Sequence, residues 1–186
     1  MTDPRNDGSA VGGLPRVSDV VATFRQVLHD DSQAQADGLL GLLVALHRIN
    51  AAQWELEDEV RAPGASDATV AAAKRGIDRL NSLRHHHVEK VDAAISDVIA
   101  PAPDAPPSTE SPGMAFDRLS VLVIRIHFTE LASRLAAPGD TGYERRLPSI
   151  SSQLTSLESA LEVFLDDLVV GTRRFQPYQS LKLYGS

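Results

Sequence analysis

Two long helical patterns in this sequence are separated by only a few residues, among them Pro63 and Gly64. Apolar residues recur every three or four positions over residues 39–60 and again over residues 70–98. Proline disfavours helix in the residue before it, and glycine permits a tight turn. Because the connection is so short, the two helices must lie side by side and run in opposite directions. The sequence therefore predicts a long antiparallel helical hairpin.

Three further helical patterns complete the chain, and no segment shows a convincing strand pattern. One pattern follows Ser18, and another follows Ser111 and Pro112, which are residue types that commonly cap and begin helices. The last carries an apolar row over residues 150–168. Residues 119–126 are apolar nearly all round, which is typical of a central helix. The sequence thus predicts an all-α fold, a bundle of four to five helices that contains the long hairpin.

The composition changes at both ends of the 186-residue chain and once within it. Residues 1–15 are rich in glycine, proline and aspartate, and we expect them to be disordered. A single helical-bundle domain is expected over residues 16–172. It contains a connector at residues 101–109, which holds four prolines and is expected to be extended. Residues 173–186 form a C-terminal tail without helical periodicity.

The bulk composition argues against several classes of protein. A formal net charge of −7 argues against binding nucleic acid through bulk charge. The chain has no cysteine, which excludes disulfides and thiolate metal sites. Its apolar stretches are too short to span a bilayer, and its N-terminus lacks the apolar segment of a signal peptide. We therefore expect a soluble cytoplasmic protein with no membrane or nucleic-acid partner, and the sequence leaves a homo-oligomer open.

Both helices of the predicted hairpin carry a polar stripe beside their apolar face. The helix expected over residues 39–60 and its end carry His47, Asn50, Trp54, Glu57, Asp58 and Arg61. The helix expected over residues 70–98 carries Lys74, Asp78, Asn81, His85, Glu89 and Asp92, and Arg84 interrupts its apolar row. Buried carboxylates cost several kcal/mol unless they are paired. The stripes are therefore consistent with a structural network that sets the register of the hairpin, with a solvated face that has local ion pairs, or with a ligand or catalytic site.

A third polar segment lies where the proline-rich connector meets the next helix. Glu110 precedes the helix, and Asp117 and Arg118 fall in its first two turns. The free N–H groups of a helix N-terminus can receive an anion. The alternative is that these charges only complement the helix end and pair locally. Basic members of the stripes, such as Arg61 and Lys74, would suit an anionic group such as phosphate.

Pairs of acids one turn apart raise the question of a metal. Asp58 follows Glu55 by three residues, and Asp92 follows Glu89 by three, a spacing that can hold magnesium or manganese in all-helical nucleotide pyrophosphohydrolases. Acids are common on helices, however, and no Glu-x-x-His motif for a di-iron site exists. We therefore predict no metal centre and keep Asp58, Glu89 and Asp92 only as weak candidate ligands. No cofactor motif and no catalytic residue can be named.

Three motifs occur in order along the chain. They read His47-x-x-Asn50-x-x-x-Trp54-x-x-Glu57-Asp58-x-x-Arg61, then Lys74-Arg75-x-Ile77-Asp78-x-x-Asn81-x-x-Arg84, then Glu110-x-Pro112-Gly113-x-x-x-Asp117-Arg118-Leu119-Ser120. With Tyr178-Gln179-x-x-Lys182-x-Tyr184 in the tail, they resemble the bacterial domain of unknown function 4254 family over about residues 36–184. The chain departs from the family pattern at Gln53, at His85-His86 and at its Gly-Ser end. The resemblance implies that the stripes form one site, but it implies no ligand and no activity.

Together these patterns favour a small anionic, phosphate-bearing ligand in a polar site between helices. The candidate ligand-binding residues are His47, Asn50, Trp54, Glu57, Asp58, Arg61, Lys74, Asp78, Asn81, Arg84, Glu110, Asp117 and Arg118. One alternative is a non-catalytic helical interaction or structural module. Another is a metal-dependent enzyme similar to the nucleotide pyrophosphohydrolases. Whether the protein is an enzyme stays open at this point.

Overall fold

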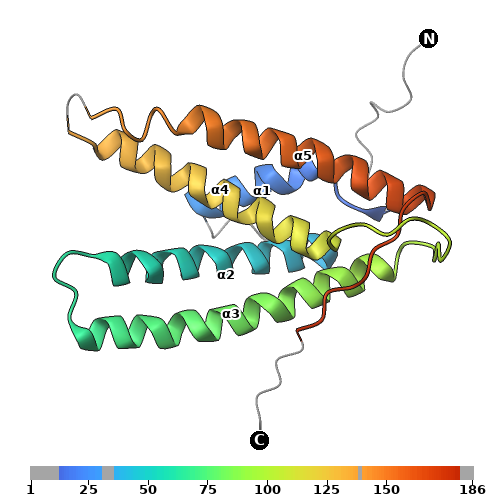
Figure 1. The fold of residues 1–186 in the computed structure, drawn as a ribbon, viewed down its shortest axis with the longest axis horizontal. Helices are drawn as coiled ribbons and strands as arrows, with labels where there is room; N and C mark the ends of the chain where they lie inside the picture. The colour runs from blue at the N-terminus through green and yellow to red at the C-terminus, as the bar shows by residue number, and fades with distance from the viewer. Residues whose placement is uncertain (1–12, 31–35, 138–139, 181–186) are drawn as a thin grey trace, which may run out of the picture.

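A computed structural model describes residues 13–30, 36–137 and 140–180 of the chain (Figure 1). Within these ranges the chain forms five helices and no strand. The helices are α1 (Val17–His29), α2 (Gly38–Arg61), α3 (Asp67–Ser96), α4 (Pro112–Leu135) and α5 (Leu147–Val170). The prediction of an all-α bundle is confirmed. None of these helices combines the length and the apolar character needed to cross a membrane.

Local signals in the sequence set where the helices begin and end. The hydroxyl oxygen of Ser66 accepts a hydrogen bond from the backbone N–H of Thr69 at the start of α3. Ser111 does the same for Met114 at the start of α4, where proline occupies the first helical position. Gly64, in the turn between α2 and α3, has a φ of 83°, a left-handed conformation that favours glycine. The hairpin turn therefore lies where the Pro-Gly pair predicts it.

The helices pack as two pairs with α1 against them (Figure 1). Helices α2 and α3 lie side by side along their length and make the most extensive contact in the bundle. Helices α4 and α5 form the second pair, and α4 contacts each of the other four helices. The expectation that residues 119–126 belong to a central helix is thereby confirmed.

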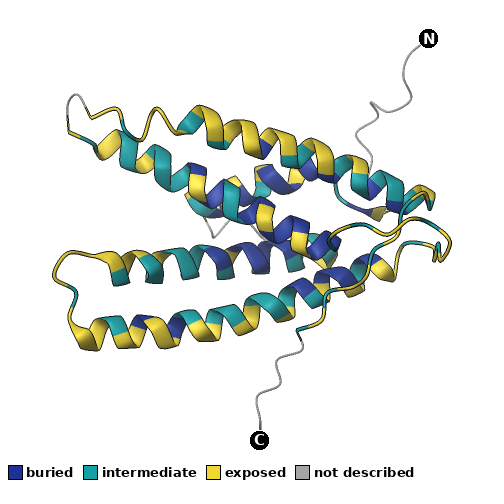
Figure 2. Ribbon diagram, in the orientation of Figure 1, coloured by how far each residue is buried: buried dark blue, intermediate teal, exposed yellow. Residues whose placement is uncertain are grey.

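The core lies where α1, α2 and α4 meet, together with the inner face of α5 (Figure 2). Its largest fully buried side chains include Phe24, Leu43, Phe116, Leu119 and Leu161. Figure 2 shows that burial decreases toward the turn between α2 and α3, where exposed residues dominate. This end of the hairpin extends beyond the core, so the polar residues near the turn are exposed to solvent.

The described part of the tail returns along the connector and across α3. Arg174 donates its backbone N–H to the carbonyl of Pro106 (3.1 Å), and its carbonyl accepts from the N–H of Ser108 (2.8 Å). The connector is extended here and is paired with the tail rather than being free. Leu14, near the other end, packs into the core, and residues 1–12 lie outside the described ranges. The predicted disorder of residues 1–15 stays a prediction.

Candidate functional site

Five polar side chains from α2, α3 and α4 form one hydrogen-bond network inside the bundle. Asn50 donates from Nδ2 to Asp117 Oδ1 (2.9 Å) and lies 3.0 Å from the hydroxyl of Ser120. His47 Nδ1 lies 2.8 Å from the same hydroxyl. Arg84 donates from Nε to Asp117 Oδ1 (2.8 Å) and from Nη2 to Asp117 Oδ2. The polar stripes of α2 and α3 therefore meet on the carboxylate and hydroxyl of α4.

Asp117 is the centre of this network, and its side chain is only 9% exposed. Its two oxygens accept a two-pronged interaction from the Arg84 guanidinium, the arrangement that guanidinium and carboxylate prefer. This hydrogen bonding holds the pKa of Arg84 above its ordinary value and outweighs the opposing effect of burial. The pair joins α3 to α4 and leaves Arg84 Nη1 outside the contacts with Asp117.

His47 is completely buried, and its ring stacks on Phe24 of α1. The ring centroids are 4.2 Å apart and the planes differ by 3°. Burial disfavours the charged imidazolium and lowers the pKa of His47 from 6.5 to about 4. His47 is thus neutral at pH 7 and packs as part of the core, away from the hollows described below.

A second polar cluster surrounds the buried carboxylate of Asp92, near the C-terminal end of α3. Its oxygens accept the backbone N–H groups of Gly113 (2.7 Å) and Tyr178 (2.8 Å). Burial raises the pKa of Asp92, and these N–H groups with Ser111 oppose that rise. A Cβ on Gly113 would lie 2.6 Å from the carbonyl oxygen of Val88, so the position requires glycine. Asp92 joins α3, the start of α4 and the tail.

The tail makes two more contacts with α3. The Tyr178 hydroxyl lies 2.6 Å from His85 Nδ1, and the two rings stack with 17° between their planes. Glu89 Oε1 accepts the backbone N–H of Ser180 at 2.5 Å. Of the tail motif, Lys182 and Tyr184 lie outside the described residues. The polar residues in the second half of α3 therefore hold the tail.

Other predicted site residues lie apart from the network. Arg61 pairs with Glu57 (2.7 Å) and Asp58 (3.4 Å) at the exposed end of α2. Lys74 and Asp78 are exposed and Asn81 is half-buried, because this part of α3 lies beyond the core. Arg118 pairs with Glu110 at 2.7 Å, and Trp54 stacks on Phe128 of α4. The structure thus brings together His47, Asn50, Arg84 and Asp117 of the predicted set.

The weak metal candidates have other partners. Asp58 pairs with Arg61, whereas Glu89 and Asp92 accept backbone N–H groups from the tail. Across residues 13–30, 36–137 and 140–180, no group of three or more histidine, aspartate or glutamate side chains is placed to hold a metal ion. These three acids therefore do not converge on one point.

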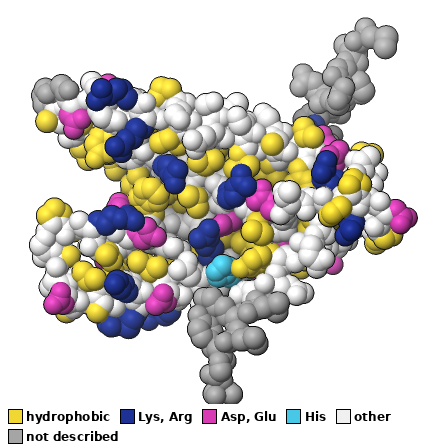
Figure 3. All heavy atoms as spheres, viewed as in Figure 1, with side chains coloured by type: hydrophobic (Ala, Val, Ile, Leu, Met, Phe, Trp, Pro, Cys, Tyr) yellow, Lys and Arg dark blue, Asp and Glu magenta, His cyan; other side chains and the backbone are white. Residues whose placement is uncertain are grey.

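Two hollows lie along α4 and α5, and the first adjoins the network at Arg84. The first, about 630 Å³, is lined by Arg84, Arg118, Val121, Leu122, Arg125, Ser152, Gln153, Ser156, Leu157 and Ala160. The second, about 800 Å³, has Trp54 and Asp58 on one side and α4, α5 and the segment before α5 on the other. Arg125 and Gln153 line both, so the hollows form one continuous groove. Figure 3 shows a row of Lys and Arg side chains along α4, with an apolar patch beside it.

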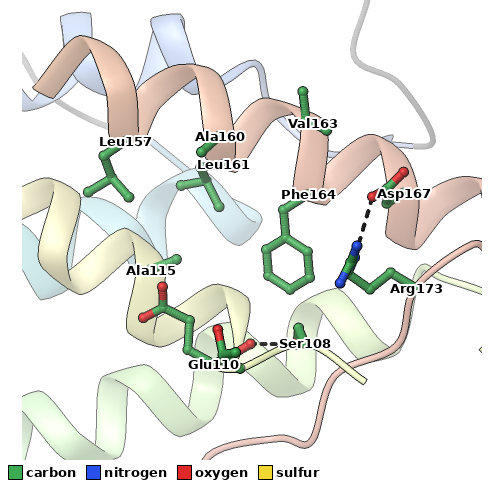
Figure 4. Close-up of a pocket in the computed structure, with 11 residues that line it drawn as sticks. Ser108, Glu110, Ala115, Leu157, Ala160, Leu161, Val163, Phe164, Asp167 and Arg173 are labelled. Atoms are coloured by element: carbon green, nitrogen blue, oxygen red, sulfur yellow. Dashed lines mark hydrogen bonds and ion pairs between the residues drawn. The ribbon is translucent and has the colours of Figure 1, made fainter. Parts of the chain in front are cut away.

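A third hollow of about 280 Å³ lies where the connector and the tail meet α5 (Figure 4). Its walls are mainly apolar, and the ring of Phe164 points into the space between α5 and the connector. Its charged groups already have partners: Asp167 pairs with Arg173 (3.4 Å), and Glu110 pairs with Arg118. This hollow is therefore less suited to an anion than the groove.

Sequence reasoning missed two members of this region, Ser120 and Arg125. Both lie in the apolar stretch 119–126, whose composition drew attention to burial rather than to polar contacts. A signal for Ser120 is its position one turn after Asp117, and a signal for Arg125 is its position two turns after Arg118 on the same helix face.

No curated protein and no solved structure matches the chain. The family model described as "Protein of unknown function (DUF4254)" matches residues 41–176, which include the three helical motifs and the whole buried network. The chain therefore belongs to the DUF4254 family.

Proposed function

We propose that the protein binds a small, phosphate-bearing anion in the first hollow of the groove. One observation carries this proposal: three arginines line the hollow together with two serines and a glutamine. These arginines are Arg84, Arg118 and Arg125. Such a concentration of cations is notable in a chain with a formal net charge of −7. Guanidinium groups recognise phosphate oxygens with paired N–H donors, and hydroxyl groups add further hydrogen bonds.

The three arginines would contribute differently. Asp117 fixes Arg84 through Nε and Nη2, which leaves the Nη1 hydrogens for a ligand and orients the guanidinium in advance. Arg118 is partly neutralised by Glu110. Arg125 is exposed and has no ion pair with any described residue, so it is the cation with the most to gain from an anion. We therefore assign Arg125 the main electrostatic contact.

The test measures binding of inorganic phosphate and pyrophosphate by calorimetry and by thermal unfolding. A ligand that binds only the native state at about 100 times its Kd stabilises it by about 2.7 kcal/mol, so the melting temperature should rise. Arg125→Gln should weaken binding at least tenfold. The matched control is Arg79→Gln, which replaces an exposed arginine on α3 that lines neither hollow. Equal binding by both variants, or no binding by the wild type, would contradict the proposal.

A second candidate function, a non-catalytic helical interaction or structural module, is favoured by the buried network itself. Asp117, Arg84 and Ser120 have partners, as expected of a network that sets the register between α2, α3 and α4, whereas the buried His47 Nε2 and Asn50 Oδ1 have none among the described residues. The two candidates separate experimentally. A structural module loses stability when Asp117 is replaced and gains none from any anion. We do not propose a metal-dependent hydrolase, because Glu89 and Asp92 are engaged with backbone N–H groups.

A further inference from the structure

The second hollow continues the first along one face of α4. Arg118, Leu122, Arg125, Phe128 and Ala132 recur at intervals of three or four residues; the first two line the first hollow, the last two line the second, and Arg125 lines both. An α-helix rises about 1.5 Å per residue, so Phe128 lies about 4.5 Å along the axis from Arg125. An anion bound to Arg125 would therefore lie next to any group bound in the second hollow.

Three of the residues that line the second hollow are aromatic, namely Trp54, Phe128 and Tyr143. Trp54 and Phe128 stack with ring centroids 5.6 Å apart and planes 9° apart, and Tyr143, on the segment before α5, also lines the hollow. The guanidinium of Arg146 lies 5.8 Å from the centre of the Tyr143 ring. Aromatic and guanidinium faces of this kind are suited to a flat ring, because both stack on π-systems.

Polar residues that line the hollows would suit the edge of such a ring. Gln153 carries both an amide donor and an acceptor and lines both hollows. Asp58 and Tyr143 line the second hollow only. Each hollow has the volume of an ordinary small-molecule site, about 300–1,000 Å³. A ligand that reaches from one hollow into the other must have a charged end and a flat, partly polar end.

We infer that the ligand is a phosphate ester that carries an aromatic ring, the chemistry of a nucleoside monophosphate. Its phosphate is held by the arginines of the first hollow, and its ring lies against Trp54, Phe128 and Tyr143 in the second. This inference rests on the proposed function, since it adds a ring-binding part to the same anion site. It distinguishes such esters from bare phosphate and from sugar phosphates.

Trp54 gives a direct readout, because it is the only tryptophan in the chain. We would titrate the protein with AMP, ribose 5-phosphate and adenosine, following tryptophan fluorescence and, separately, heat. AMP should quench Trp54 saturably and bind at least tenfold more tightly than ribose 5-phosphate. Tyr143→Ala changes an exposed residue and should remove most of that preference while leaving ribose 5-phosphate binding intact. Phe128→Ala is the second variant, and Arg79→Gln is the control that should change nothing.

The outcomes separate the two proposals. If AMP and ribose 5-phosphate bind equally, depend on Arg125 and leave Trp54 fluorescence unchanged, the ring inference is overturned and the anion site stands. If neither compound binds, both proposals fail. If AMP quenches Trp54 equally in the wild type and in Arg125→Gln, the phosphate is not held by the groove and the joined site is overturned. Loss of the AMP preference in both aromatic variants would support the inference.

Discussion

Acidification should destabilise this protein through one buried histidine. The pKa of His47 is about 4 in the native state and 6.5 in the ordinary, solvated state, because burial disfavours the imidazolium. Between these two pH values the unfolded chain binds a proton at position 47 and the native protein does not. The contribution of His47 to the free energy of unfolding is therefore fully present above pH 6.5 and is lost as the pH falls toward 4. Each pH unit of this difference corresponds to about 1.4 kcal/mol, so the whole effect is about 3 kcal/mol.

The assay is urea unfolding followed by circular dichroism at several pH values from about 7.5 to about 4.5. The free energy of unfolding of the wild type should fall by about 2.5 kcal/mol over that range because of His47. His47→Gln has no titrating group at this position, so its stability should depend much less on pH. It should also be less stable at neutral pH, because the stacking on Phe24 is lost. His127 keeps a residual slope in the variant, because burial also lowers its pKa.

The difference between the two pH profiles isolates His47, since the proteins share every other titratable group. His86→Gln is the control, because it also replaces a helix histidine but one whose side chain is 56% exposed, so the loss of stability due to His47 should persist in it. The reasoning is refuted if wild type and His47→Gln lose stability in parallel as the pH falls.

Three further substitutions test the packing of the polar clusters. Asp117→Ala leaves the Arg84 guanidinium, whose side chain is 30% exposed, without its carboxylate partner. In urea unfolding, the free energy of unfolding should fall by about 2–4 kcal/mol. A fall of less than about 0.5 kcal/mol would contradict the buried network. Gly113→Ala places a Cβ 2.8 Å from the Asp92 carboxylate as well as against backbone, so thermal unfolding should show a cost of about 1–3 kcal/mol; an unchanged melting temperature would show that the helices separate easily. Asp92→Ala removes the acceptor of the Tyr178 N–H, and hydrogen exchange should become faster at that amide while the middle of α2 stays protected; unchanged exchange at Tyr178 would contradict the assignment.

The fold was largely predictable because its signals are local. Pro63 and Gly64 interrupt a helical periodicity that resumes within a few residues, and only an antiparallel pair satisfies so short a connection. The start of α4 followed from Ser111 and the proline after it. Such signals depend on neighbours in sequence and need no knowledge of the tertiary structure.

The candidate site was only partly predictable, because it depends on where the helices cross. His47 and Asn50 lie at the level of α4 and are buried, whereas Lys74 and Asp78 belong to the same stripes but lie near the hairpin turn and reach solvent. Spacing gives the face of a helix but not the position along its axis at which a neighbour covers it. Arg125 shows the converse: an apolar stretch includes one exposed position, and that position faces the groove.

The carboxylate of Asp92 lets the tail and the start of α4 open separately. It receives one N–H from the start of α4 and one from Tyr178, a residue 86 positions further along the chain. The two N–H groups meet different oxygens of the same side chain. When the tail detaches, the contact with α4 remains, and when α3 and α4 separate, the contact with Tyr178 remains on α3. Neither opening therefore requires the other.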